Sequence, residues 1–252
     1  MKIVFCSAMY NEESVAQLVM DGIIELLDEI EIISFVVVND GSTDRTSIIL
    51  ESYAHKHLNI IKHNNRSGIG ACIYTGLQLA QSSGATHFGF LPGNGRIEVS
   101  EIKKLLSLDN LNQPEYLMGS RFLHTGYHQG IPGYRKVLIQ IFSASFSFLL
   151  KIKLTDISCG LRLISLHNWD HSLDVNFLKS QYSGEQILTL VAIETELIIR
   201  EVGINLVYSP LRPYSHLKFL DLPQIIWPWI RYIVWKKAKI AFLKPVWLYS
   251  TQ

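Results

Sequence analysis

The chain has 252 residues, a formal net charge of +1, 48% hydrophobic residues and 18% charged residues. A chain of this length and composition buries a sizeable core, which excludes intrinsic disorder. The near-zero net charge argues against a nucleic-acid partner held by bulk electrostatics, and one large domain is expected rather than two small ones.

The cysteines and the N-terminus indicate the compartment. Cys6, Cys72 and Cys159 lie far apart, without metal-ligand or disulfide-motif spacing, which is typical of reduced thiols. The opening stretch "MKIVFCSAMYNEE" reaches acidic residues too early for a signal peptide, so a cytoplasmic protein is expected. No apolar run approaches the roughly 20 residues of a membrane-spanning helix. The longest, residues 137–150, predicts a buried or interfacial helix.

Strands and helices alternate along the first half of the chain. Short apolar runs, the first rich in β-branched residues, predict strands at residues 2–9, 33–40, 58–63, 87–93 and 115–121. Helical spacing of apolar residues predicts helices at 14–30, 42–57, 68–84 and 98–108. This alternation predicts an α/β fold, with a mostly parallel sheet covered by helices on both faces.

Polar or glycine-rich segments follow each predicted strand. They are "MYNEE", "NDGSTD", "HNNRSGIG", "PGNGR" and "GSR". Ligands of parallel α/β sheets bind beyond the carboxyl ends of the strands, so these segments are expected to form one site.

The pattern changes after residue 130. Helices are expected at 134–150 and 185–202, followed by a strand-like stretch at 204–212. Residues 222–247 mix aromatic residues with Arg231, Lys236, Lys237, Lys239 and Lys244, which predicts an amphipathic, membrane-interfacial helical tail. We therefore expect one domain at 1–221 and a tail at 222–252.

Five motifs carry a resemblance to a known family. "YNEE", "VVVNDGSTDRT", "SGIGACIYTGLQLA", "LMGSRF" and "DISCGLRLIS" resemble blocks of the inverting family 2 glycosyltransferases, which have the GT-A (Rossmann-like) fold. The glycine pattern is similar to that of the dolichyl-phosphate mannose synthase and polyprenyl-phosphate glycosyltransferase branch. The resemblance covers roughly residues 2–215, and it implies a nucleotide-sugar donor.

The first three motifs imply a donor site. By resemblance, Glu12 and Asp40 contact base and ribose, beside a loop that includes Tyr10 and Asn11. Asn39 replaces the first aspartate of the usual pair. Gly68 and Gly70 allow a ligand to approach the backbone, and the helix that they open favours anions. A capped turn before a helix would also explain "NDGSTD" if it stood alone.

The stretch "FLPGNGR" departs from the family. In relatives this block carries two aspartates and an amide that bind Mg²⁺ or Mn²⁺, whereas the three positions here are Pro92, Asn94 and Arg96. Since hard cations need several oxygen ligands, no conventional metal site is expected. The sequence leaves two readings open: Arg96, with Asn94 and the backbone at Gly93, stabilises the departing diphosphate, or catalysis is lost and a scaffold remains, with a possible membrane-protein partner.

Two arginines are expected on the acceptor side. By resemblance, Arg121 and Arg135 hold the phosphate of a polyprenyl or dolichyl phosphate at the cytoplasmic membrane surface. A phosphate nucleophile needs no general base. A saccharide hydroxyl, as in surface polysaccharide synthesis, would need one, with Asp156, Glu194 and Glu196 as the candidates.

Overall fold

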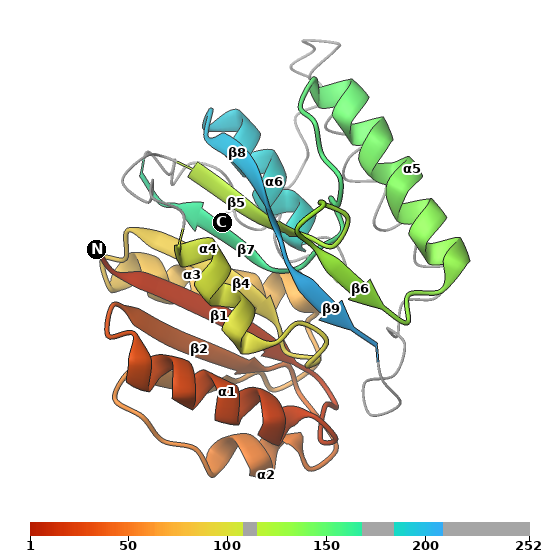
Figure 1. Cartoon of the computed structure of the whole chain (residues 1–252). Coiled ribbons are helices and arrows are strands. Elements are labelled where there is room, and N and C mark those ends of the chain that lie inside the picture. The colour runs from red at the N-terminus through yellow and green to blue at the C-terminus, as the bar shows by residue number, and fades with distance from the viewer. Residues whose placement is uncertain (108–114, 168–183, 209–252) are drawn as a thin grey trace.

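The computed structural model describes residues 1–107, 115–167 and 184–208. Within these residues a seven-stranded sheet has the strand order β3-β2-β1-β4-β7-β5-β8 (Figure 1). Its strands are β1 (Ile3–Met9), β2 (Ile33–Asn39), β3 (Leu58–Lys62), β4 (His87–Pro92), β5 (Glu115–Ser120), β7 (Arg162–Ser165) and β8 (Ile198–Gly203). The mostly parallel α/β sheet predicted from the sequence is confirmed, and β7 alone among these strands runs antiparallel to its neighbours.

Helices cover both faces of the sheet. They are α1 (Ala16–Glu29), α2 (Thr46–Glu51), α3 (Ile69–Ser82), α4 (Ile102–Leu106), α5 (Gly133–Leu150) and α6 (Gly184–Glu194), with a short 3-10 turn at Val99–Glu101. Side chains alternate along β1 because successive residues of a strand face opposite ways. Ile3 and Phe5 pack with α1 and α4 in one core, while Val4 and Cys6 pack with α3 and α6 in the other.

The direction of the strands fixes where a ligand can bind. β1, β2, β3 and β4 are parallel, and two antiparallel pairings through β7 make β5 parallel to them as well. The carboxyl ends of these five strands therefore share one edge of the sheet, which we call the carboxyl edge. The segments that the sequence singles out all begin there.

Two expected helices are wrong in part. The helix expected at 42–57 is limited to Thr46–Glu51. The helix expected at 185–202 ends at Glu194, and Ile198–Gly203 forms β8, hydrogen-bonded in parallel to β5. Glu196 has a φ of 56°, a left-handed conformation that a helix cannot continue through. The β-branched residues Ile198, Ile199 and Val202 then favour the extended chain.

A smaller unit lies beside the main sheet. β6 (Tyr127–Gln129) pairs with β9 (Asn205–Val207), and α5 follows β6 at the periphery of the molecule (Figure 1). Among the described residues, no helix is both long and apolar enough to cross a membrane. The expected tail at 222–252, and with it the domain boundary at residue 221, lies outside the described residues.

Candidate functional site

The loops after β1 and β2 are fastened to each other. The Asn11 side chain accepts a hydrogen bond from the Thr43 backbone N–H at 2.8 Å and donates one to the Thr43 hydroxyl at 3.2 Å. Asn11 has a φ of 54°, a conformation that asparagine tolerates better than most residues. Asn39 donates to the Ser47 hydroxyl at 2.8 Å and accepts from the Ser42 N–H at 3.0 Å. Both asparagines therefore shape the candidate donor loops.

Asp40 holds the glycine loop in place. It is 3% exposed, and its Oδ1 accepts from the Ser67 N–H and faces His63 Nδ1, each at 2.9 Å. Its Oδ2 accepts from the Gly68 N–H at 2.7 Å. Gly68 has a φ of 91° and caps the start of α3, a conformation that requires glycine. The carboxylate is thus engaged from several sides, which makes Asp40 a positioning residue of this loop.

An aromatic ring and a guanidinium lie at the same edge. The Arg66 guanidinium carbon stands 4.4 Å from the centre of the Tyr10 ring. Tyr10 follows β1 and Arg66 precedes α3, so the pair bridges two of the loops. A planar pair of this kind offers a stacking surface for a base.

Arg96 is the centre of a charged cluster that we call the arginine cluster, namely Arg96, Arg121 and Arg135. Burial lowers the pKa of Arg96, nearby Tyr208 and Glu12 raise it, and the charges of Arg135 and Arg121 lower it again. The Arg96 guanidinium carbon also lies 5.0 Å from the centre of the Tyr208 ring. Arg121, at the end of β5, and Arg135, in the first turn of α5, therefore both lie within electrostatic reach of Arg96 in the β4 loop.

Glu12 adds one carboxyl group to this cluster. Burial raises the pKa of Glu12 to about 7, against the opposing influence of Arg96, and Asp44 raises it further. The Glu12 backbone N–H donates to the Thr46 hydroxyl at 2.9 Å, which fixes the loop. Near neutral pH Glu12 is partly protonated, so it cancels the positive charge of the arginine cluster only in part.

Arg121 and Asp156 form a buried ion pair. Arg121 Nε donates to Asp156 Oδ2 at 2.5 Å, and Nη2 donates to Asp156 Oδ1 and to the Ser158 hydroxyl, each at 2.6 Å. Burial alone would lower the pKa of Arg121, but Asp156 outweighs it and the pKa is raised. The backbone N–H groups of Thr155 and Asp156 in turn donate hydrogen bonds to the Glu201 carboxylate. Arg121 Nε and Nη2 are thus committed to contacts within the protein.

The three candidates for the general base of a hydroxyl acceptor differ in burial and in position. Asp156 is completely buried and paired with Arg121, so taking up a proton would break that ion pair. Glu196 is exposed between α6 and the start of β8, at the edge of the sheet opposite the carboxyl edge. The side chain of Glu194 lies outside the described residues.

The residues present do not fit the divalent metal that the resemblance implies. Of the three positions, Pro92 offers no side-chain ligand, Arg96 is a cation, and the Asn94 side-chain oxygen already accepts the Arg96 N–H at 3.2 Å. A Cβ on Gly93 would lie 2.5 Å from the Ala8 carbonyl oxygen, so that glycine is required by packing. We derive no step through a metal ion.

One other set of described residues brings potential metal ligands together. Single ligand atoms of Asp40, His63 and Cys72 lie within 4.8 Å of one another. The Asp40 oxygens accept from backbone N–H groups, and His63 Nε2 lies 3.0 Å from the Thr75 hydroxyl. Burial raises the pKa of the Cys72 thiol strongly. These groups form a hydrogen-bonded network that already satisfies them without an ion.

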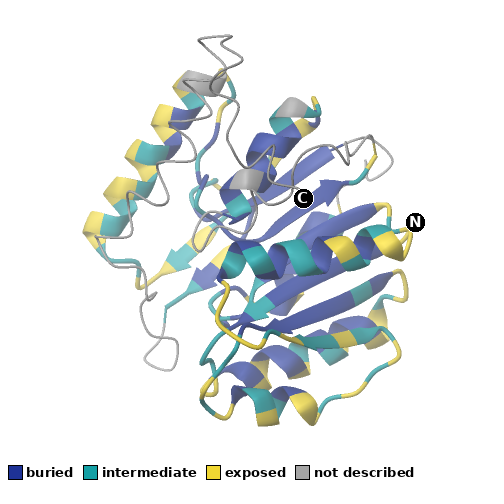
Figure 2. Cartoon of the chain, turned by 180° about the vertical axis from the view of Figure 1, so that it is seen from behind, coloured by how far each residue is buried: buried dark blue, intermediate teal, exposed yellow. Residues whose placement is uncertain are grey.

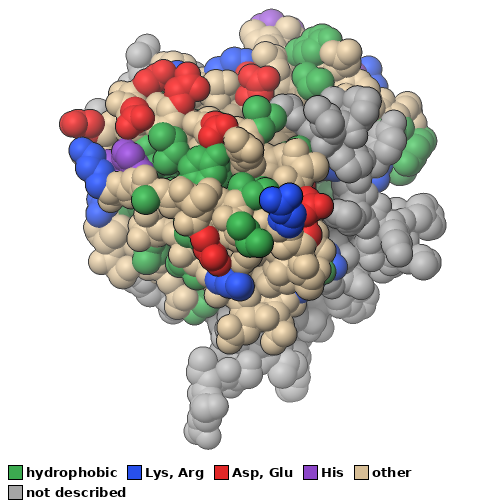
Figure 3. Space-filling model, turned by 90° about the horizontal axis from the view of Figure 1, so that it is seen from below, with side chains coloured by type: hydrophobic (Ala, Val, Ile, Leu, Met, Phe, Trp, Pro, Cys, Tyr) green, Lys and Arg blue, Asp and Glu red, His purple; other side chains and the backbone are tan. Residues whose placement is uncertain are grey.

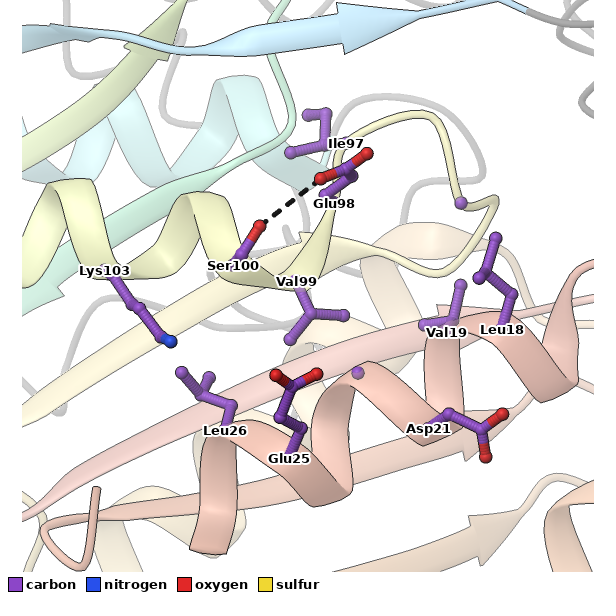
Figure 4. Close-up of a pocket in the computed structure, with 12 residues that line it drawn as sticks. Leu18, Val19, Asp21, Glu25, Leu26, Ile97, Glu98, Val99, Ser100 and Lys103 are labelled. Atoms are coloured by element: carbon purple, nitrogen blue, oxygen red, sulfur yellow. Dashed lines mark hydrogen bonds between the residues drawn. The ribbon is translucent and has the colours of Figure 1, made fainter. Parts of the chain in front are cut away.

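A hollow of about 260 Å³ lies between α1 and residues 95–103 (Figure 4). Asp21, Glu25 and Glu98 line it together with Lys103, whose ammonium group pairs with Glu29. Because three of its four charged lining residues are acidic, it is unsuited to a diphosphate. The candidate donor site is therefore the carboxyl edge and not this hollow.

Three residues of the site were missed by sequence reasoning. His63 supports Asp40, and Tyr208 faces Arg96 from the end of β9. Glu185 lies in the first turn of α6. Its carboxyl group is close to Gly160, because a Cβ added to that glycine would lie 3.6 Å from Glu185 Oε1 and 2.3 Å from the Pro92 ring. Burial raises the pKa of Glu185, against the opposing charge of Arg162. His63 ends a predicted strand and begins the segment "HNNRSGIG", so it could have been included on that ground, whereas the other two depend on tertiary contacts.

Comparison with solved structures defines the class of protein. The chain superposes on glucosyl-3-phosphoglycerate synthase from Mycobacterium tuberculosis, solved with Mn²⁺, uridine diphosphate and phosphoglyceric acid, with a TM-score of 0.63 and 15% identity over 95% of this chain and 79% of that one. At this identity the match establishes the fold alone. The fold is of the GT-A type, as the resemblance implied.

Sequence comparison gives the family. The glycosyl transferase family 2 model matches residues 5–165, so the chain belongs to that family and is a glycosyltransferase. An uncharacterized glycosyltransferase EpsJ of Bacillus subtilis is 31% identical over 107 residues, which is 42% of this chain and 29% of that protein. A UDP-N-acetylglucosamine–dolichyl-phosphate N-acetylglucosaminyltransferase of Methanococcus voltae is 26% identical over 215 residues, 79% of this chain and 83% of that protein.

Proposed function

We propose that the protein transfers a sugar, with inversion, from a nucleoside-diphosphate sugar to a polyprenyl or dolichyl phosphate at the cytoplasmic face of a membrane. The observation that carries the proposal is the arginine cluster at the carboxyl edge. The likeness to a dolichyl-phosphate sugar transferase over most of both chains supports the same acceptor class.

The arginine cluster suits a reaction between two phosphate-bearing substrates. Arg121 and Arg135 both repel Arg96, although Asp156 offsets part of the Arg121 charge, and a bound anion relieves that repulsion. Arg96, on the β4 loop beside Glu12, is assigned to the diphosphate of the donor. Arg135, in the first turn of α5, is assigned to the acceptor phosphate, and Arg121, at the end of β5, to the same acceptor side.

For this reaction the protein mainly has to position the two substrates and stabilise the leaving group. A phosphate oxygen is anionic at neutral pH, so it attacks the anomeric carbon without a general base. The nucleoside diphosphate departs as a second anion, and Arg96 stabilises the charge that develops on it. Attack opposite the leaving group inverts the anomeric centre. The buried position of Asp156 is compatible with this route, because no proton has to be removed.

A turnover assay tests the proposal directly. The protein is incubated with nucleoside-diphosphate sugars and a polyprenyl phosphate, with and without a chelator, and the anomeric configuration of the product is read by NMR. We expect an inverted glycosyl phospholipid, formed also in chelator. Loss of donor binding in chelator, restored by Mn²⁺, would contradict the assignment of Arg96.

Two substitutions separate the donor side from the acceptor side. Arg96→Ala is expected to weaken donor binding by about 1–3 kcal/mol, the cost of an unmet charged hydrogen bond. Arg135→Gln should raise the KM for the acceptor while leaving donor affinity nearly unchanged. Arg45→Ala, an exposed arginine on the same side of the sheet, is the control for loss of charge. Equal loss of donor affinity in Arg96→Ala and Arg135→Gln would contradict this division.

A second candidate function is transfer to a saccharide hydroxyl. Glu185 favours it, because this carboxyl group and the Pro92 ring both lie next to Gly160, and burial raises the pKa of Glu185. If hydroxyl acceptors are used, Glu185→Gln should abolish turnover with them. On a phosphate acceptor the same variant should keep its activity.

A further inference from the structure

One face of α5 is apolar and exposed. Tyr134, Val137, Leu138 and Ile141 recur at the three- and four-residue spacing that aligns side chains on one side of a helix, and Phe148 follows two turns after Ile141 on the same side. Ile141 is 58% exposed and Phe148 is 85% exposed. We call these five residues the outer face of α5. A contiguous apolar stripe on an otherwise polar surface marks an interaction site.

The opposite face of the same helix is already packed. Phe146 is buried and Phe142 packs against the same core, and the two rings meet edge to face with centres 4.7 Å apart. The Ser143 hydroxyl accepts the Ile157 N–H at 3.1 Å. Figure 2 shows the exposed and half-buried residues of α5 against the buried strands of the sheet. Within the described residues, the helix therefore packs on the core along one side and exposes its outer face.

The charged residues of the segment that contains α5 are all basic. Residues 131–155 contain Arg135, Lys136, Lys151 and Lys153 and no aspartate or glutamate. Lys151 and Lys153 are exposed at the end of the helix, opposite the end that carries Arg135 and Lys136. By contrast, the face seen from below shows acidic and basic side chains with apolar groups scattered between them (Figure 3). An apolar stripe with cations at both ends complements an anionic apolar layer.

These observations favour a lipid surface over a second copy of the chain. Two copies meeting through this stripe would bring the basic ends of their helices together, and like charges repel. A membrane with anionic headgroups attracts the same residues, and its acyl region accepts the apolar ones. Eighteen helical residues measure about 27 Å, enough for the helix to lie flat in the interface.

We propose that the outer face of α5 docks on an anionic lipid bilayer. This inference rests on the proposed function in one respect: docking would bring Arg135, in the first turn of the helix, to the depth of lipid phosphate groups. The acceptor phosphate would then meet the arginine cluster without leaving the membrane surface. Binding to vesicles can be measured without turnover, so failure of the docking and failure of the proposed reaction are distinguishable.

The test places a fluorophore on the outer side of the helix. Ala144 is exposed on α5, and the native cysteines Cys6, Cys72 and Cys159 are all buried, so Ala144→Cys can be labelled selectively with an environment-sensitive dye. Ile48→Cys on α2 is the matched control, since Ile48 is 65% exposed on a different element. We expect a blue shift at position 144, and none at position 48, on adding phosphatidylcholine vesicles that contain phosphatidylglycerol.

Two charge variants complete the test. Ile141→Glu should lower the partition of the full chain onto these vesicles about tenfold, while Ile48→Glu should leave it unchanged. Both positions are exposed, so both variants should retain the thermal stability of the parent. Equal vesicle binding by the two variants would overturn the proposal. A blue shift that grows with protein concentration without lipid would also overturn it, in favour of a second copy. An equal shift with phosphatidylcholine alone would refute the need for anionic lipid.

Discussion

At the scale of single residues, Asp40 has a structural task that the sequence does not reveal. Its carboxylate accepts the backbone N–H groups of Ser67 and Gly68 and faces His63. Asp40→Asn should therefore lower the free energy of unfolding by about 1.5–3 kcal/mol, the range for hydrogen bonds to a charged group. Denaturant unfolding without any ligand measures this. Unchanged stability, with loss of donor binding alone, would restore Asp40 to the purely ligand-binding role that the resemblance implies.

Glu12 gives the protein a pH-dependent stability. Its pKa in the folded chain is about 7, against an ordinary value of 4.5, so the folded state keeps a proton that the unfolded state has lost between these values. Stability therefore falls as pH rises through this window, by up to about 3 kcal/mol from 1.36 kcal/mol per pKa unit. Glu12→Gln imitates the protonated form and should remove this fall.

Unfolding curves at pH 5 and pH 8 check the effect of Glu12. Glu25→Gln, at an exposed position on α1, is the control and should keep the dependence of the parent. If Glu12→Gln loses as much stability between the two pH values as the parent does, another group is responsible.

At the scale of elements, the start of α6 is packed against the start of α3. A Cβ on Gly184 would lie 2.8 Å from the Gly70 Cα and 2.9 Å from Ile73 Cδ1. Gly184→Ala should therefore destabilise the protein by about 1–3 kcal/mol through overpacking. Gly133→Ala is a matched control, because Gly133 opens α5 in the same way and a Cβ there meets nothing within 4 Å. Equal thermal midpoints for the two variants would contradict this account of the helix contact.

The elements that sequence reasoning found and missed differ in kind. The strands from β1 to β5 are predictable because each is a short, largely apolar run that ends in a polar segment. β7 was missed because it has only four residues and begins at Arg162, whose guanidinium is buried and donates to the Cys159 and Ile157 carbonyls. β8 was assigned to a helix because its apolar run continues that of α6. Short strands inside a sheet depend on neighbours that local sequence does not show.

The site was predictable to the same extent as the strands. Loops that follow parallel strands must meet at one edge, so the convergence of the Tyr10, Asp40, Gly68 and Arg96 loops follows from the sequence pattern. The side-chain contacts within the site do not follow from the sequence pattern. Arg121 lies 35 residues from Asp156 along the chain, and only the tertiary fold shows that each neutralises the other.

At the scale of the whole molecule, the tail remains a prediction. Deleting residues 222–252 is expected to weaken binding to anionic vesicles, since Arg231 and the tail lysines each favour an anionic surface by roughly 1 kcal/mol. It should also reduce activity on long-chain lipid acceptors more than on short soluble analogues. Flotation with vesicles and assays on both acceptor types measure this. Unchanged vesicle binding by the truncated, folded chain would show that the tail is no anchor.

The placement of β7 has a consequence for the dynamics of the molecule. The chain leaves the sheet at Ser120 and re-enters it at Arg162, so β6 and α5 belong to one excursion whose two ends are joined by the Arg121–Asp156 pair. A segment fastened at its ends can open as a cooperative unit while the strands stay paired. Backbone amides of α5 should therefore exchange with solvent deuterium together, and faster than those of β1 and β4. Lipid added to such an experiment would slow this exchange at α5 and leave the sheet unaffected.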